Sequence, residues 1–173
     1  MTSASITSDQ FRQAMAHFAT GVAVVTAQDD HGDQGATISA LSSVSLDPLT
    51  LLICLKRGSA TCRAIEHTRR FGLSVLSHEQ EPIARYFAMP ADRKQGTVAT
   101  RREADGTVLV EGALVHIAAE VVETLRGGTH EIFLARPLSV TVDSDPAAGP
   151  LLYFRGAFDL PAHTERHAGT GMS

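Results

Sequence analysis

Residues 20–39, with the sequence TGVAVVTAQDDHGDQGATIS, form the stretch that decides the fold. Apolar and β-branched residues dominate from Val22 to Thr26, which is typical of a strand. Asp and Gly then gather in residues 29–33, DDHGD, and favour a tight turn. Small and hydroxyl-bearing residues continue to Ser39 as a second strand-like segment. The stretch therefore predicts a β-hairpin.

Strand patterns recur along most of the chain outside this hairpin. Further strand-like segments lie at residues 35–39, 44–46, 49–55, 71–76, 114–124, 132–142 and 151–154. Many short strands with few helices favour a sandwich or a closed barrel, and closure removes exposed strand edges. The sequence predicts a mainly β fold, a Greek-key β-barrel of about six strands with flanking helices.

Three helix starts are marked by side chains that can cap a helix. Thr7 and Gln10 have capping-box spacing before an amphipathic run. Ser59 precedes a helical pattern that extends to residue 67, and Ser77 with Gln80 repeats the capping box before a third helix. These signals predict three helices that interrupt the strands.

Composition and charge exclude several classes of protein. The chain has 173 residues, is 43% hydrophobic and carries a net charge of −4. The charged residues are scattered along the chain and form no basic cluster that would bind nucleic acid. No apolar run reaches the roughly 20 residues that are needed to cross a bilayer. We expect one domain over residues 1–160, a disordered tail over residues 161–173, a cytoplasmic location, and no binding to nucleic acid or membrane.

Two further features bear on metals and mobility. Cys54 and Cys62 lack the spaced partners of a zinc site and are interpreted as reduced thiols. His163 and His167 have helical ligand spacing but no third ligand, so no metal is expected. Residues 90–106 are charged and weakly patterned, and we expect a mobile loop there.

Three segments carry candidate chemistry. Residues 56–61, KRGSAT, join a strand to a helix and offer cations, hydroxyls and helix-terminal N–H groups to an anion, although Ser59 as a simple N-cap explains them equally well. Residues 35–45 are small enough for a flat ligand to reach the backbone, or are an ordinary strand and turn. His130 follows a double glycine and is either a ligand contact or a surface residue.

The ordered set of these motifs resembles the flavin reductase family with an FMN-binding split β-barrel, the reductase components of two-component flavin-dependent monooxygenases. The resemblance covers residues 10–158. It rests on FATGVAVVT at 18–26, GAT at 35–37, SVSLDP at 43–48, GAL at 112–114, GTH at 128–130 and PLLYFRG at 150–156.

The resemblance implies a flavin site and a nicotinamide site. The flavin-binding residues would be Thr37, Ile38, Ser39, Ala40, Cys54, Leu55, Lys56, Ser59, Ala60, Thr61, Tyr86 and Phe87. The nicotinamide-binding residues would be Gly128, Thr129, His130, Phe154, Arg155 and Gly156. No protein side chain is assigned as catalytic, because hydride transfer is cofactor chemistry.

Three departures from the family pattern stand out. Thr129 replaces the usual Asp of a Gly-Asp-His triplet. Arg85 lies one residue before the position of the family's Arg, which Tyr86 occupies. Lys94 or Gln95 stands where relatives carry an aromatic residue.

The implied activity is an NAD(P)H:flavin oxidoreductase that passes hydride from NADH or NADPH to N5 of FMN or FAD and supplies a partner monooxygenase. A homodimer is also implied. Two alternatives remain: a flavin oxidase with tightly bound FMN, and a non-catalytic barrel that binds flavin or heme.

Overall fold

The computed structural model describes residues 5–30, 32–90, 93–143 and 149–159. Its strands are β1 (Thr20–Gly21), β2 (Ala23–Asp29), β3 (Gly32–Ile38), β4 (Leu41–Leu46), β5 (Leu49–Lys56), β6 (Arg70–Val75), β7 (Thr100–Arg102), β8 (Val108–Val110), β9 (Val115–Gly127), β10 (His130–Val142), β11 (Leu152–Phe154) and β12 (Ala157–Asp159). Its helices are α1 (Ser8–Ala16), α2 (Ala60–Thr68), the 3-10 turn η1 (His78–Gln80) and α3 (Glu81–Ala88). The predicted tail, with His163 and His167, lies outside the described residues.

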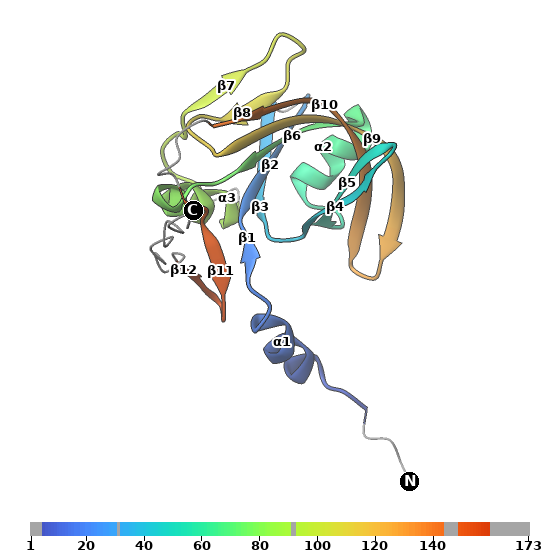
Figure 1. Ribbon diagram of the computed structural model, residues 1–173, viewed down its shortest axis with the longest axis vertical. Helices are drawn as coiled ribbons and strands as arrows, with labels where there is room; N and C mark the ends of the chain where they lie inside the picture. The colour runs from blue at the N-terminus through green and yellow to red at the C-terminus, as the bar shows by residue number, and fades with distance from the viewer. Residues whose placement is uncertain (1–4, 31, 91–92, 144–148, 160–173) are drawn as a thin grey trace, which may run out of the picture.

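One large antiparallel sheet organises the molecule and confirms the mainly β prediction (Figure 1). Its seven strands run in the order β3-β2-β6-β9-β10-β5-β4. The predicted hairpin is present as β2 and β3, with Ala23 opposite Ile38 and Asp29 opposite Gly32. The sheet curves strongly around α2, so its two edge strands approach each other (Figure 1).

The two edges of the sheet meet at a two-residue link. β3 and β4 lie at opposite ends of the strand order, yet only Ser39 and Ala40 separate them in the chain. The backbone N–H of Cys54 in β5 donates to the carbonyl of Ala40 at 3.1 Å and fastens this link to the far edge. A link this short forces the edges together, which makes the sheet a barrel and leaves residues 39–40 at its seam.

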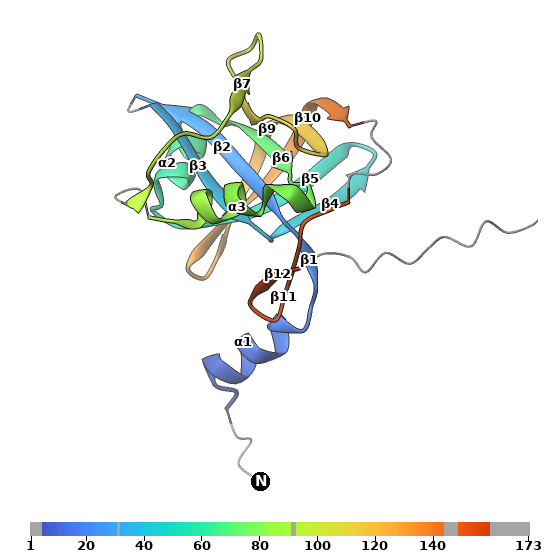
Figure 2. The same cartoon turned by 90° about the vertical axis from the view of Figure 1, so that its left-hand side faces the viewer.

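Buried side chains on both faces of β2 explain its unbroken apolar run. Ala23 and Val25 belong to the core that holds Phe71, and α2 also packs there. Val22 and Val24 belong to a second core beneath α3, which crosses β2 and β3 on the outside of the barrel (Figure 2). Since neighbouring residues of a strand point to opposite faces, a strand between two cores is apolar throughout.

The caps that the sequence predicts are present. Thr7 Oγ1 accepts a hydrogen bond from the N–H of Gln10 at 3.2 Å, and Gln10 Oε1 accepts from the N–H of Thr7 at 2.9 Å. Ser59 Oγ accepts from the N–H of Cys62 at 3.3 Å at the start of α2. The N–H of Ser77 donates to the Gln80 side chain at 3.1 Å, and η1 leads directly into α3.

The prediction of one long loop over residues 90–106 was wrong in part, because β7 falls inside it. β7 pairs with β8, whose short apolar run Val108–Val110 is buried and was missed in the sequence. Arg102 at the end of β7 binds both carboxylate oxygens of Asp33, at 3.0 and 2.8 Å. A tertiary ion pair and burial of β8 therefore order a charged segment that has little strand pattern of its own.

Within the described residues, no helix is long and apolar enough to cross a membrane. The longest described helices, α1 and α2, have nine residues each.

Candidate functional site

A cavity of about 300 Å³ opens at the barrel seam. Four separate elements line it: the end of β3 with the seam link, the end of β5, the start of α2 and the start of β10. The lining residues are Ala36, Thr37, Ile38, Ser39, Ala40, Cys54, Leu55, Lys56, Ser59 and His130. Three segments that the sequence marks separately as candidates thus converge on one space.

One side of this cavity is suited to an anion. Lys56 ends β5, and Gly58 takes a left-handed backbone with a φ of 72°, which lets the chain turn into α2. Ser59 then caps α2, where the first N–H groups of a helix have no intrahelical acceptor. A cation, a hydroxyl and the positive end of a helix therefore face the same opening.

The opposite wall is built from small residues of β3 and the seam link. Thr37 Oγ1 donates to the carbonyl of Ala84 in α3 at 2.6 Å, so this side chain fastens β3 to α3. Cys54 of β5 also lines the cavity, and burial raises the pKa of its thiol, which keeps that part of the lining uncharged near neutral pH. Small uncharged side chains let a flat ring approach the backbone closely.

His130 lines the same cavity from β10, the strand next to β5 in the sheet. It is the first residue of β10 and lies opposite Lys56 in the β5–β10 pairing. His130 Nδ1 lies 3.0 Å from Thr129 Oγ1. A hydroxyl can either donate to or accept from Nδ1, so this contact can hold either imidazole tautomer of His130.

Several sequence-predicted residues do not line this cavity. Ala60 and Thr61 follow Ser59 in the first turn of α2, and Thr61 is buried. Gly128 and Thr129 form the β9–β10 turn beside His130.

The aromatic pair of α3 packs against the barrel wall instead. A Cβ on Gly35 would lie 2.5 Å from the Phe87 ring, so Gly35 lets this ring lie against β3. Lys94 Nζ lies 5.6 Å from the Tyr86 ring centroid and 5.2 Å from that of Phe87, and donates to the Gly35 carbonyl at 3.2 Å. Lys94 thus covers the two rings.

Phe154 is the last residue of β11, and Arg155 and Gly156 form the turn that leads into β12. Arg155 and Gly156 line a second cavity of about 560 Å³ beneath α1, and Ser39 and Ala40 line both cavities. Ser39 and Ala40 are thus the shared wall between the two sequence-predicted nicotinamide segments. Neither of these two cavities is lined by described residues of both segments.

One charged residue near the cavity escaped the sequence analysis. Glu131 is 5% exposed and follows His130 in β10. The signal that could have found it is a carboxylate at the start of the apolar run EIFLA. A buried carboxylate needs a partner, and Arg57 provides it at 2.9 Å.

The curved antiparallel sheet, closed at the seam of residues 39–40, is a split β-barrel. A model of the flavin reductase like domain matches residues 15–160. A Rhodococcus opacus protein, the reductase component of 4-nitrophenol 4-monooxygenase/4-nitrocatechol 2-monooxygenase, is 39% identical over 86% of this chain and 78% of its own. An NADH-dependent flavin reductase of a Rhodococcus species is 33% identical over 88% of this chain and 86% of its own. The chain belongs to the flavin reductase family.

Solved structures agree with this assignment. An NADH:FAD oxidoreductase of Streptomyces globisporus, solved with NAD and FAD fragments, has a TM-score of 0.83 and 31% identity, and the match covers 91% of this chain and 94% of its own. The styrene monooxygenase flavin reductase of Pseudomonas putida has a TM-score of 0.80 and 31% identity, over 88% and 97%. The chain therefore shares both the sequence family and the fold of these flavin reductases.

Proposed function

We propose that the protein transfers hydride from NADH or NADPH to N5 of FMN or FAD at the seam cavity and supplies the reduced flavin to a partner flavin-dependent monooxygenase. The observation that carries the proposal is the convergence of Lys56, Ser59 and His130 on one cavity with a wall of small residues. We further propose a cytoplasmic location, where reduced nicotinamides are produced.

The hydrogen-bond donors and the positive charge that line the cavity are suited to a phosphorylated flavin. Bound flavin supplies the hydride acceptor, since no amino-acid side chain reversibly accepts a hydride. Lys56, Ser59 and the first N–H groups of α2 would bind the phosphate. The backbone of residues 37–40 would lie along the ring, and Leu55 with Cys54 would exclude water from that side.

His130 would orient the reduced nicotinamide. Its Nδ1 is held by Thr129, which directs Nε2 outward from that contact. An imidazole N–H would donate to the carboxamide oxygen of the donor, and His130 would carry no proton to the reacting atoms. Orientation is valuable because hydride transfer needs the two reacting atoms close together, roughly 3–3.5 Å apart.

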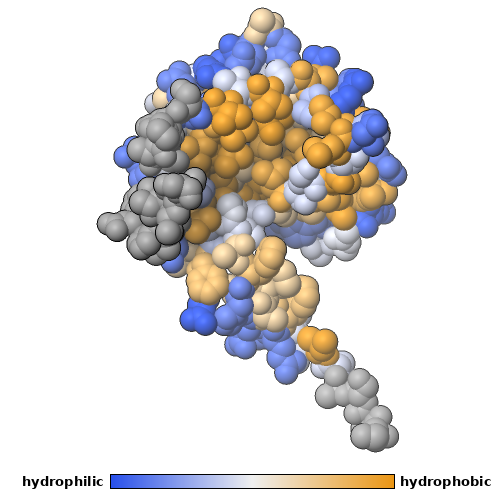
Figure 3. All heavy atoms as spheres, in the orientation of Figure 1, coloured by the Kyte–Doolittle hydropathy of each residue, from blue (hydrophilic) through white to orange (hydrophobic). Residues whose placement is uncertain are grey.

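We propose that the protein is a homodimer, because a single chain leaves much apolar surface uncovered. Figure 3 shows apolar residues gathered over the sheet on the face above α1. Exposed apolar residues include Leu46, Val140 and Val142 of the sheet at 82%, 56% and 66%, and Phe11 of α1 at 62%. Apolar areas of this kind mark interfaces, and a twofold dimer is the commonest way to cover them.

Sedimentation velocity tests the dimer. We expect one species of twice 18.4 kDa at micromolar concentration, and a shift towards the single chain in Leu46→Asp, because a charge at the interface would have to be desolvated. Thr100→Asp in β7, a strand whose three residues are all exposed, provides the comparison. An unmodified chain that sediments as one monomeric species would contradict the dimer.

Loss of nicotinamide absorbance tests the activity itself. Purified protein is given NADH or NADPH, each with FMN, FAD or no added flavin. We expect rapid oxidation that depends on added flavin. Oxidation without added flavin, by protein that keeps its flavin through gel filtration, would instead favour an oxidase with bound FMN. Flavin or heme binding with no oxidation in any combination would favour a non-catalytic module and would refute the reductase.

A further inference from the structure

Arg57 makes three contacts with the turn between β9 and β10. Its Nε donates to Glu131 Oε1 at 2.9 Å, and its Nη2 donates to the carbonyl of Gly128 at 2.7 Å. Its backbone N–H donates to the carbonyl of Thr129 at 3.0 Å. A single residue after β5 thus holds three of the four residues from 128 to 131.

The fourth of these residues is His130. The contacts of Arg57 fall on both sides of it, and the imidazole lines the seam cavity. Arg57 itself stands between Lys56 and Gly58, in the loop that presents Ser59 to the same cavity. The residue therefore connects the loop at the anion end of the cavity to the turn that carries the histidine.

The burial of Glu131 makes this connection stiff. The Glu131 side chain is 7% exposed and the Arg57 side chain 42% exposed. Removing one partner from a buried ion pair leaves an uncompensated charge and is far more costly than losing a surface pair. Arginine also presents its donors in a rigid planar fork, which fixes direction as well as distance.

We propose that Arg57 and Glu131 are positioning residues: they lock the β9–β10 turn to the β5–α2 loop and so hold His130 at a fixed place over the flavin. This inference rests on the proposed function, because it assigns the nicotinamide to His130 and the flavin phosphate to Lys56 and Ser59. A small displacement of His130 would cost nicotinamide affinity and hydride-transfer geometry, since both depend on close alignment.

The test compares two variants, Arg57→Gln and Glu131→Gln. Glu131→Gln removes the carboxylate charge but keeps a side-chain oxygen that can accept a hydrogen bond from Arg57. We expect Arg57→Gln to raise the KM for the nicotinamide about tenfold and to lower kcat, while the Kd for FMN, from flavin fluorescence, rises no more than about threefold. Glu131→Gln should also raise the KM for the nicotinamide more than the Kd for FMN, but by a smaller factor than Arg57→Gln. Arg57→Lys should restore only part of the loss, because a lysine cannot make both contacts with one rigid fork.

A double-mutant cycle shows whether Arg57 acts through His130. His130→Ala should raise the KM for the nicotinamide at least as much as Arg57→Gln, and the double variant should be no worse than His130→Ala alone. If the increase in KM in the double variant equals the product of the two single increases, Arg57 acts independently of His130, and this result would overturn the proposal.

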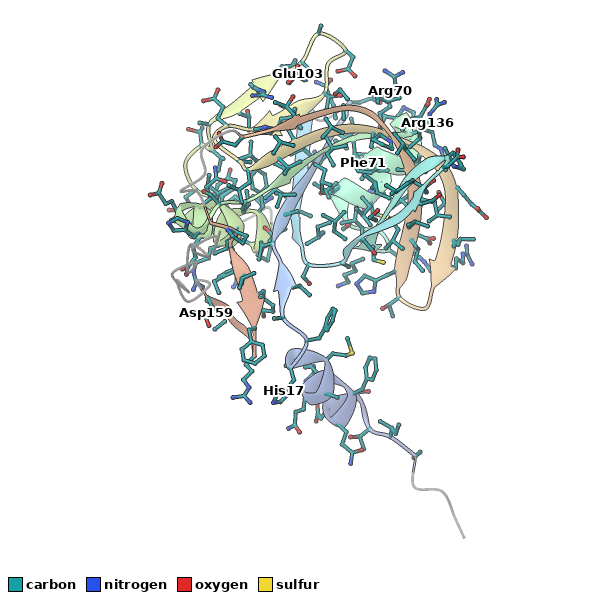
Figure 4. All side chains as sticks on the ribbon, in the orientation of Figure 1. His17, Arg70, Phe71, Glu103, Arg136 and Asp159 are labelled. Carbon is teal, nitrogen blue, oxygen red and sulfur yellow. The ribbon has the colours of Figure 1, made fainter. Side chains whose placement is uncertain are left out.

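A matched control breaks a second ion pair that also involves a residue of β10. Arg136 of β10 pairs with Glu120 of β9 at 2.8 Å, is largely exposed and lies on the outside of the barrel (Figure 4). We expect Arg136→Gln to leave both KM and kcat within twofold of the unmodified protein, because exposed pairs contribute little.

Amide hydrogen exchange separates this proposal from the proposed function. We expect Arg57→Gln and Glu131→Gln to speed exchange in residues 128–131, with or without bound FMN, because the turn loses its anchor. Unchanged exchange in both variants would overturn the positioning role even in an active enzyme. If exchange in residues 128–131 is faster in the two variants but the unmodified protein never oxidises nicotinamide, Arg57 and Glu131 do hold the turn and the flavin reductase activity is refuted.

Discussion

Lys56→Glu is expected to weaken FMN binding about a hundredfold. Lys56 is exposed and lines the seam cavity beside Ser59, where the phosphate is proposed to bind. A contact to a charged group contributes roughly 1.5–3 kcal/mol, and a carboxylate at this position would repel the phosphate as well. A loss of about 3 kcal/mol corresponds to the hundredfold change, measured as the Kd from flavin fluorescence.

Riboflavin is the matched ligand for this experiment, because it has the same ring and ribityl chain without the phosphate. Its Kd should change by less than about threefold in Lys56→Glu. Arg101→Glu in β7, an exposed site outside the cavity, makes the same change in net charge and should leave FMN binding intact. Equal losses for FMN and riboflavin would contradict the assignment of the phosphate to this end of the cavity.

Gly72→Ala is expected to cause the largest loss of stability. A Cβ on Gly72 would lie 2.1 Å from the carbonyl oxygen of Val108 and 2.7 Å from Thr26 Oγ1. The same carbonyl accepts a hydrogen bond from Thr26 Oγ1, so neither neighbour can move away without breaking that contact. Because the neighbour is backbone in a packed region, the added methyl must displace β8 or distort β6, at a cost of about 3 kcal/mol.

Thermal unfolding measures this loss, and we expect Tm to fall by roughly 6–12 °C for a chain of this size. Gly21→Ala is the matched control, since Gly21 also lies in a strand and a Cβ there would have no heavy atom within 4 Å. Its Tm should stay within about 2 °C of the unmodified protein. Similar Tm values for the two variants would contradict the close packing of β8 against Gly72.

The local elements followed directly from the sequence. Thr7 and Gln10 stand three residues apart and bond to each other in the structure, and Ser59 caps α2 in the same local way. The hairpin of β2 and β3 likewise depends on a turn of a few residues between two strand patterns. The family resemblance added the barrel type, which the family model and solved relatives confirm.

The candidate site was identified only in pieces. The sequence marked residues 35–45, residues 56–61 and His130 as separate segments, each with an ordinary structural explanation. Their meeting in one cavity depends on the strand order, which places β3 and β5 at the seam and sets His130 opposite Lys56. Phe154, Arg155 and Gly156 were grouped with His130 by resemblance, but Arg155 and Gly156 line a second cavity, which shares Ser39 and Ala40 with the cavity that His130 lines.

The caps, the hairpin and the mainly β class can be predicted from the sequence alone, because they depend on residues a few positions apart and on the period of apolar side chains. Three features form only when the whole chain folds: the seam at residues 39–40, the ion pair of Arg102 in β7 with Asp33, and the ion pair of Arg57 with Glu131. The residues of that last pair are 74 positions apart. Their contact exists because β5 and β10 are neighbours in the folded sheet, and no local pattern encodes which strands become neighbours.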